Sequence, residues 1–477
     1  MWVARRFECI DMEIQAICHA CLLKREGNTT LLMDPWIKGT VFMGGWGLQP
    51  EPLEDTIRDL PPIDYIYLTH EHSDHTHIGS LKGLFEGPAK NATLIIPKFM
   101  TDRFPKWLAG IFPGRSIIEM AHGKEYQFGD FTAWSYQYRN DDSTLVLRGR
   151  DGQTCLNIND TFVKGIPLKA ILEAHPKVDV LISQYSIANA YPYAYTDYHT
   201  DPNSFPWDHE DLKQYCVDVL KLAKPKMWVP YHSFMWFCRP ENAYMNEFKI
   251  TIDEIDDFVA PQVQDTTRIV RLYPGDVLKS GEYLPHPKGR EHFYAPTTQQ
   301  VGEKKVQPAE ELMKAAKTFE STFKDSVAWI FRRKVRPCGF ICEDDGTHLL
   351  FDPKASTFTI ARADLKQQNP DVSWTTTSQQ ILIDSFRLPW GMASLLISGC
   401  MVTQVPEQFR GDDFVFWAVG LIRHTGYFNL KTLWFLKPRA LGTMLRRRHE
   451  AYDILWKTLK AGSLIKGNVA PRHNTVE

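Results

Sequence analysis

Apolar runs of strand length alternate with stretches of helical spacing along the first half of the chain. The apolar runs stand at residues 65–68, 92–97 and 178–183, and each is followed by a polar break. Helical spacing is found at residues 78–84 and 212–222. Strands that alternate with helices indicate a sheet covered by helices, so this half is predicted to be an α/β unit.

Further strands are expected before and between these elements. A hairpin is predicted from residues 14–24 and 29–34, joined by the turn at 26–28. The remaining predicted strands are residues 128–138, 143–148, 153–160, 227–231 and 268–272.

The second half is read less clearly. Residues 308–332 have helical spacing, 348–360 and 372–377 are expected strands, and 378–384 begins a helix. Residues 386–405 and 414–422 fit either a helix or a strand. A polar, proline-containing stretch at 286–305 is interpreted as a linker between a domain at 1–285 and an α+β domain at 306–477.

Composition narrows the class of protein. The 477 residues are 43% hydrophobic and 23% charged, and the formal net charge is -2, so no overall positive field favours nucleic acid as a partner. Nine scattered cysteines favour a reducing compartment, and neither a secretory leader nor a membrane-spanning run is evident. A cytoplasmic protein is the resulting expectation.

Four potential metal ligands follow the apolar run at 65–68 within six positions: His70, His72, Asp74 and His75. On an extended segment His70 and His72 share a face, so both can point at one ion. Once the chain bends, Asp74 and His75 turn towards a second ion. Imidazole and carboxylate ligands without thiolate suit zinc, iron or manganese, and the spacing does not choose among them.

Three other residues stand at strand ends, where they could complete such a centre. Asp34 precedes Pro35 and is placed to hydrogen-bond the metal loop from behind, although a turn aspartate has the same spacing. Asp160 closes a predicted strand and could bridge two ions. His232 follows another strand and is predicted to be a ligand, although a single histidine there is more often a packed one.

Two polar segments add candidates outside the metal loop. The aromatic, proline-rich stretch 191–209 is interpreted as a lid or a structural insertion, with Tyr195, His199 and His209 as polar candidates. Arg446, Arg447 and Arg448 form a basic cluster, which is usually a solvated helix face but could contact a phosphate.

The order Asp34, His70-x-His72-x-Asp74-His75, Asp160, His232 resembles the metallo-β-lactamase superfamily. A closer likeness is to the catalytic part of the CMP-N-acetylneuraminate hydroxylase family, in His19-Ala20-Cys21, residues 31–39, 156–160 and 273–276. The resemblance implies an αββα sandwich with two metal ions, iron favoured and zinc or manganese as options. The C-terminal domain resembles a sterol-carrier-like module in residues 369–377 and Gly399, which implies a lipid pocket. Docking or homodimerisation is the preferred interpretation of this domain.

Two departures from these families stand out. The hydroxylase family carries a Rieske iron–sulfur domain, whose Cys-x-His and Cys-x-x-His pairs are absent from this sequence, so electrons would come from a separate donor or from the substrate. The superfamily also provides a histidine before the Asp160 strand, and this chain has none there. Either Tyr138, Asn140 or Asp141 substitutes for it, or one ion has fewer protein ligands and open positions.

Three functions follow from the resemblance and the ligand set. The first is a diiron oxygenase that hydroxylates a polar small molecule, with or without a linked nucleotide. Its catalytic candidates are Asp74, Tyr138 and His199. The second is a zinc-dependent hydrolase of lactones, phosphodiesters or amides, in which Asp74 orients a metal-bound water. The third is a non-catalytic scaffold with a degenerate metal fold.

Overall fold

The computed structural model describes residues 12–138, 142–186, 189–204, 208–297, 307–333, 335–362, 364–388, 390–409 and 429–448. The ligand substitutes Asn140 and Asp141 and the apolar stretch 414–422 lie outside these residues.

An eight-stranded sheet forms one half of the first unit, with the strand order β17-β16-β1-β2-β3-β5-β6-β7. Its central strands are short and mostly buried, and their apolar residues are typical of a sheet covered on both faces. The strands are β1 Glu13–Cys18, β2 Cys21–Glu26, β3 Thr29–Met33, β5 Tyr65–Tyr67, β6 Thr93–Pro97, β7 Ile117–Met120, β16 Val277–Lys279 and β17 Glu282–Leu284.

A seven-stranded sheet forms the other half, with the strand order β15-β13-β12-β11-β10-β9-β8. It is antiparallel from β8 to β11 and parallel from β11 to β15. The strands are β8 Glu125–Phe128, β9 Phe131–Tyr138, β10 Asp142–Arg148, β11 Thr154–Asn159, β12 Val180–Ser183, β13 Met227–Pro230 and β15 Arg268–Ile269.

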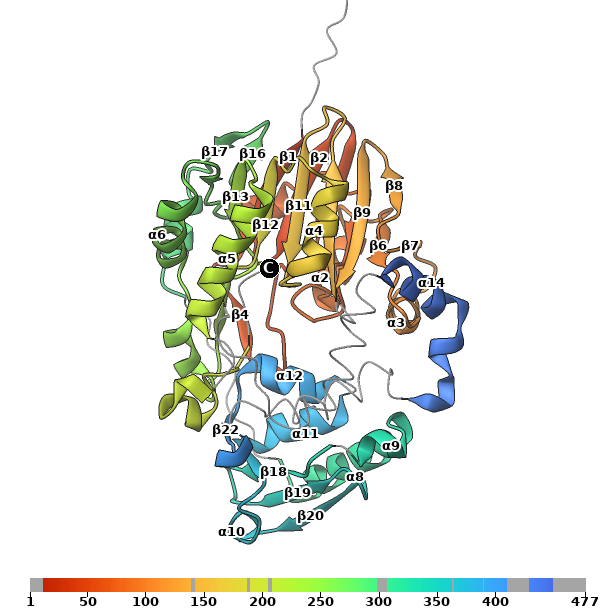
Figure 1. Ribbon diagram of the computed structural model, residues 1–477, viewed down its shortest axis with the longest axis vertical. Helices are drawn as coiled ribbons and strands as arrows, with labels where there is room; N and C mark the ends of the chain where they lie inside the picture. The colour runs from red at the N-terminus through yellow and green to blue at the C-terminus, as the bar shows by residue number, and fades with distance from the viewer. Residues whose placement is uncertain are drawn as a thin grey trace, which may run out of the picture.

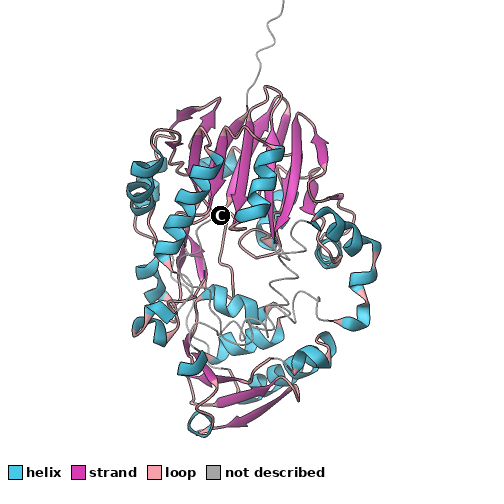
Figure 2. Cartoon of the chain, in the orientation of Figure 1, coloured by secondary structure: helices cyan, strands magenta, loops and turns pink. Residues whose placement is uncertain are grey.

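The two sheets pack face to face. The Tyr67 hydroxyl of one sheet lies 3.0 Å from the hydroxyls of both Ser135 and Ser143 of the other, and Lys24 Nζ lies 3.1 Å from Cys155 Sγ. Figures 1 and 2 show α4 and α5 lying over the seven-stranded sheet. The helices of this unit are α1 Glu54–Arg58, α2 Ile78–Glu86, α3 Arg103–Ile111, α4 Gly165–Ala174, α5 His209–Ala223, α6 Ile252–Val263 and α7 Gly289–Tyr294. The predicted αββα sandwich is therefore present.

The single strand predicted for residues 14–24 is wrong. The chain reverses at His19 and Ala20, so that β1 and β2 pair in an antiparallel hairpin with Cys18 opposite Cys21. His19 adopts a φ of 35°, a left-handed conformation that makes this tight reversal possible. The apolar run is continuous across the turn, and for that reason periodicity alone did not reveal it.

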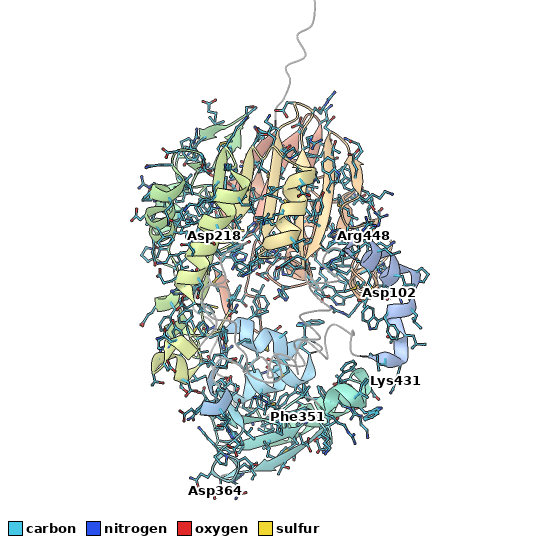
Figure 3. The ribbon with its side chains drawn as sticks, viewed as in Figure 1. Asp102, Asp218, Phe351, Asp364, Lys431 and Arg448 are labelled. Carbon is cyan, nitrogen blue, oxygen red and sulfur yellow. The ribbon has the colours of Figure 1, made fainter. Side chains whose placement is uncertain are left out.

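A five-stranded sheet forms the second unit, with the order β20-β19-β18-β21-β22. Phe351, labelled in Figure 3, is fully buried and packs edge-on against Phe319 and Phe323 of α8. Its strands are β18 Cys338–Cys342, β19 His348–Asp352, β20 Thr357–Ala361, β21 Ser373–Thr377 and β22 Val402–Gln404. Its helices are α8 Ala309–Ser326, α9 Trp329–Arg332, α10 Leu365–Gln368, α11 Gln379–Arg387 and α12 Gly391–Ser398. The last described helix, α14 Pro438–Arg446, packs against the first unit instead, where Arg439 pairs with Glu119.

Two sequence expectations for this unit need correction or completion. The strand predicted at 348–360 is two strands, β19 and β20, which pair antiparallel across a turn at Ser356. The undecided stretch 386–405 contains both a helix, α12, and a strand, β22. The resemblance to a sterol-carrier module stays a prediction.

The second unit docks on the first through the segment predicted to be a lid. Ala190 N donates to Leu396 O at 2.9 Å, and Thr403 N donates to Ala194 O at 2.7 Å. A small sheet made by β4 Trp46–Leu48 and β14 Met235–Phe237 lies beside this contact, where the Phe237 ring packs near Gly399. The aromatic stretch is therefore part of the interface between the units.

The expected linker begins inside the first unit. In α7, Phe293 packs edge-on against Phe234, and His292 Nε2 contacts Glu51 O at 2.7 Å. Among the described residues, no helix combines the length and the apolar character that crossing a bilayer demands.

Candidate metal centre

The loop after β5 carries its ligands as an extended segment followed by a turn. His75 N and Thr76 N both donate to His72 O, at 3.1 and 2.7 Å, so the chain bends immediately after His72. This bend brings Asp74 and His75 back towards the strand end. His70, Asp74 and His75 are each no more than 2% exposed.

One group of potential ligands contains His19, Asp74 and His75. Asp74 Oδ2 lies 3.3 Å from His19 Nε2 and 3.1 Å from His75 Nε2. A second group contains His70, His75 and Asp160, with Asp160 Oδ2 at 3.1 Å from His75 Nε2. Within each group the ligand atoms all lie within 4.8 Å of one another, which is the spacing of atoms around a common cation.

His72 extends the second group. Its Nδ1 lies 2.8 Å from His70 Nε2, so the two ring nitrogens face each other. A neutral imidazole offers one donor and one acceptor nitrogen, and two such nitrogens aimed at one point are typical of ligands that share an ion. The structure thus brings together His70, His72, Asp74, His75 and Asp160.

Asp34 and Thr69 hold this loop from behind. Asp34 Oδ2 lies 3.1 Å from His75 Nδ1, and its other oxygen accepts from Thr69 N at 2.8 Å. Asn159 Nδ2 donates to Thr69 Oγ1 at 2.7 Å. A carboxylate on the rear nitrogen of a ligating histidine fixes its tautomer and its ring orientation, which is the role expected of Asp34 from the sequence.

Asp142 supports the other side of the loop. Its Oδ1 lies 3.4 Å from His70 Nδ1, and it is the first residue of β10. Sequence reasoning did not single it out, although it follows directly after the candidates Asn140 and Asp141.

The centre has an excess of negative charge, because three carboxylates surround His75. Burial alone would lower the pKa of His75, but Asp74, Asp160 and Asp34 raise it well above the ordinary value for histidine. Burial would raise the pKa of Asp74, but His75 and His19 hold it well below its usual range. Without an ion, the proton on His75 therefore supplies the positive charge that the surrounding carboxylates require.

Several atoms around the centre are buried without a hydrogen-bond partner among the described residues. They are His19 Nδ1, Asp74 Oδ1, Asp160 Oδ1 and His232 Nδ1. Unsatisfied buried polar atoms are costly, and an ion is the simplest group that would satisfy lone pairs converging from several directions. The donor set, its charge and these unsatisfied atoms all fit divalent metal ions.

His232 contacts Asn157 and is not in either group of potential ligands. Its Nε2 lies 2.9 Å from Asn157 Oδ1. Burial, with His75 and His19 nearby, lowers its pKa well below the ordinary value. A neutral imidazole can act as a ligand, so His232 stays a predicted ligand whose free nitrogen is Nδ1.

Backbone strain concentrates at the centre. His19, Asp34, Asn159 and His232 all have φ between 35° and 61°, in the left-handed region that non-glycine residues rarely adopt. Strain of this kind persists where the surrounding structure fixes a functional geometry.

The two remaining catalytic candidates lie elsewhere. Tyr138 is at the end of β9 and lines a pocket beside α4 together with Arg446. His199 belongs to a short 3-10 helix, Thr196–His199, where its Nε2 lies 2.9 Å from Tyr193 O and its ring packs near Phe248. Tyr138 also pairs in the sheet with Asp142, which contacts His70.

His19 is the ligand candidate that sequence reasoning missed. The sequence shows it only as part of the likeness in His19-Ala20-Cys21, because a single strand over residues 14–24 gives it no reason to face the metal loop. A histidine within an otherwise apolar run was the available signal, and the hairpin turn is what aims it at Asp74.

A pocket of about 190 Å³ opens beside the metal loop, and His72 is one of its lining residues. Phe42, Trp107 and Ile78 of the first unit line it together with Trp390 and Ile397 of the second. Trp107 and Trp390 meet edge-on with ring centroids 5.8 Å apart. Figure 1 shows α12 on the side of the second unit that faces the sandwich, and this helix closes the pocket.

A sequence profile described as "Beta-lactamase superfamily domain" matches residues 29–232, a span that contains the whole loop from His70 to His75, Asp160 and His232. Residues 29–232 form a metallo-β-lactamase-superfamily domain. His19, which contacts Asp74, lies just outside the matched span.

Curated relatives of this metallo-β-lactamase-fold chain include cytidine monophosphate-N-acetylneuraminic acid hydroxylases. This chain is 25% identical over 305 residues to cytidine monophosphate-N-acetylneuraminic acid hydroxylase of Danio rerio. The matched region covers 58% of this chain and 48% of the relative. This chain is 38% identical over 291 residues to the "inactive" hydroxylase of Homo sapiens, covering 57% and 55%. The chain thus spans about half the length of these relatives.

Solved structures with detectable likeness include both hydroxylases and hydrolases. CmlA, a diiron β-hydroxylase from Streptomyces venezuelae, is 16% identical, with 58% of this chain and 54% of that chain covered and a TM-score of 0.38. Isothiocyanate hydrolase from Delia radicum gut bacteria is also 16% identical, with 57% and 100% covered and a TM-score of 0.41. Likeness at these scores does not decide the chemistry.

Proposed function

We propose that this chain is a metal-dependent enzyme of the oxygenase class, which hydroxylates a small molecule bound in the pocket beside His72. The supporting observation for this reaction is the likeness to CMP-N-acetylneuraminic acid hydroxylases over more than half of the chain. Because one of these relatives is described as inactive, the proposal also depends on the ligand set of this chain.

His70, His72 and Asp160 would hold one ion, and Asp74, His75 and His19 would hold the second. Asp160 belongs with both, since its carboxylate contacts His75. His232 is a further predicted ligand of the same centre, through its Nδ1. Histidine and carboxylate ligands suit iron, and a two-iron centre supplies oxygen activation when loaded. The reaction would consume one O2, two electrons from a separate donor and two protons. One oxygen atom would be inserted into a C–H bond of the substrate, and the other would be released as water.

The pocket residues would place the substrate. Trp107, Trp390 and Phe42 offer apolar surface against which a hydrocarbon group can pack next to His72. Glu71 and Arg103, an ion pair that also lines the pocket, would meet the polar part of the molecule. This arrangement fits a polar small molecule that carries one apolar segment to the reaction site.

The test combines metal content with oxygen consumption. Freshly purified full-length protein is expected to hold about two iron ions per chain by elemental analysis. With a chemical reductant and CMP-N-acetylneuraminic acid, it is expected to consume oxygen and yield a product that has gained one oxygen atom by mass spectrometry.

The variant that tests the proposed ligand set is His72→Ala, which removes a ligand at the surface of the pocket. It should lower iron content and stop oxygen consumption while the circular dichroism spectrum is unchanged. Protein that holds only zinc, and that consumes no oxygen with any reductant, contradicts the oxygenase proposal.

A zinc-dependent hydrolase is the second candidate, because Asp74 is favourably placed for it. One oxygen of Asp74 contacts His19 and His75, while the other is buried without a partner and could accept a proton from a metal-bound water. Zinc-loaded protein that cleaves lactone or phosphodiester substrates under nitrogen supports this candidate and excludes a need for oxygen.

A further inference from the structure

A second pocket, of about 360 Å³, lies on the outer side of the seven-stranded sheet, away from the metal centre. Tyr136 and Tyr138 of β9 form one wall, and Ile166 and Ala170 of α4 form another. Arg446 and Arg447, from the C-terminal end of α14, complete it. We call it the outer pocket.

The outer pocket is separated from the metal centre by the sheet itself. Alternate residues of β9 point to opposite faces, and Ser135 points inward, where its hydroxyl meets Tyr67. Tyr136 is on the opposite face, where its hydroxyl lies 2.8 Å from His175 Nε2, just past the end of α4. A ligand in the outer pocket would therefore not contact the metal ligands.

The docking of α14 is specific. Arg439 forms an ion pair with Glu119 of β7, and its Nε donates to Phe99 O at 2.7 Å. These contacts fix the helix against the first unit, as Figure 1 shows, and so bring the arginines that follow to the pocket. Arg447 is only 6% exposed there, which is unusual for an arginine.

The described lining residues of the outer pocket are basic or uncharged. Among its described lining residues none is acidic, while Arg446, Arg447 and His122 are basic or titratable. Burial, together with the nearby Arg447 and Arg446, lowers the pKa of His122 to about 3. His122 Nδ1 accepts from Gln137 N at 3.0 Å, so the imidazole is held neutral beside the guanidinium groups.

We propose that the outer pocket binds a small phosphomonoester that carries an apolar body. Two guanidinium groups present the forked donors that match phosphate oxygens, and they do so more specifically than ammonium groups would. The tyrosine and aliphatic walls pack the body of the ligand. The volume of about 360 Å³ falls in the ordinary range of small-molecule sites.

The test is a calorimetric titration of the full-length protein at low salt with inorganic phosphate and with phenyl phosphate. Phenyl phosphate is expected to bind more tightly than inorganic phosphate, because only it reaches the apolar walls. Arg447→Ala is expected to weaken phenyl phosphate binding about tenfold or more, and Arg446→Ala by a smaller factor.

Arg448→Ala is the matched control. Arg448, labelled in Figure 3, is exposed on the same turn and is not among the lining residues, so its removal is expected to leave binding unchanged. Ile166→Glu adds a carboxylate at a position that is 56% exposed, and it should weaken binding even if Arg447→Ala fails to fold.

Three results would overturn the proposal. The first is no phosphate binding at millimolar concentration. The second is an equal loss with Arg448→Ala, which would indicate a diffuse charge effect. The third is binding that survives Arg446→Ala, Arg447→Ala and Ile166→Glu, which would place the phosphate at the metal centre instead.

Discussion

Two histidines on different sides of the same sheet, His75 buried and His122 half-buried, have neighbours of opposite charge. His75 lies among Asp34, Asp74 and Asp160, and these carboxylates raise its pKa despite its burial. His122 lies beside Arg446 and Arg447, and burial together with these arginines lowers its pKa to about 3. The residue type is the same, and the neighbours alone reverse the effect.

The contrast indicates what each site requires. The inner centre holds more negative charge than its own groups can balance, so it favours a cation. The outer pocket has positive charge and no described acidic lining residue, so it favours an anion. The hairpin of β9 and β10 joins the two, because Tyr138, which lines the outer pocket, pairs with Asp142, which contacts His70.

The largest expected effect is on the inner side. Asp160→Asn keeps the shape of the side chain but removes a charge that stands within reach of both proposed ions. We expect metal content to fall from about two ions to less than one per chain, and any metal-dependent activity to fall about a hundredfold or more. Elemental analysis after gel filtration measures the first effect.

Asp151→Asn is the control for that substitution. Asp151 lies in the turn before β11, where it accepts a bond from Gln153 N, and it is outside both ligand groups. Equal metal content in Asp160→Asn and in the wild type would refute the role assigned to Asp160.

A smaller effect is expected when the support behind His75 is weakened. Asp34→Asn removes the carboxylate from His75 Nδ1 and leaves all the ligand atoms in place. Metal affinity, measured by competition with a chromophoric chelator, should weaken about 10–100-fold. An unchanged affinity would mean that the Thr69 and Asn159 bonds alone orient the loop.

A change in the pH dependence of stability is expected on the outer side. The pKa of His122 in the folded chain is lowered to about 3, so between that value and its ordinary value near 6.5 only the unfolded chain binds the proton. The free energy of unfolding therefore falls as pH falls through this window, by up to about 1 kcal/mol per pH unit from this residue.

His122→Asn should remove this contribution, since the asparagine oxygen can still accept from Gln137 N but does not titrate in this range. Urea unfolding at pH 6.5 and pH 5 should show a smaller loss of stability in the variant than in the wild type. Parallel losses would show that His122 is solvated and does not sense the arginines.

The smallest expected effect concerns Tyr138. Because it lines the outer pocket, Tyr138→Phe should leave metal content and metal affinity unchanged. A loss of metal in this variant would show that its hydroxyl reaches the inner centre, and it would break the separation of the two sites.

The residues of the inner centre could be predicted where neighbouring positions in the sequence identify them. The spacing of His70, His72, Asp74 and His75 specifies a compact loop, and the strand before Asp160 ends where its apolar run ends. Asp34 was expected behind the loop because it ends a strand, and it does contact His75.

The features that could not be predicted from the sequence depend on tight turns and on contacts between segments far apart in the chain. His19 reaches the centre only because the chain reverses within an unbroken apolar run. Tyr138 was expected near the ions from its position in the family order, but strand alternation and α14 put it in another pocket. The closing of the inner pocket by α12 depends on contacts between segments far apart in the chain, such as that of Ala190 with Leu396, which no local pattern specifies.

The contribution of α12 to the inner pocket has a consequence for how the protein is made. During synthesis the loop with His70 to His75 leaves the ribosome long before Gly391–Ser398 exists. A metal ion taken up at that time would meet a centre open to water. The pocket beside His72 would be enclosed only after α12 had been made and had folded back onto the first unit. Delivery of the ion and enclosure of the site are therefore separable events, and a shortened chain that ends before α12 should load metal while leaving the ion exposed.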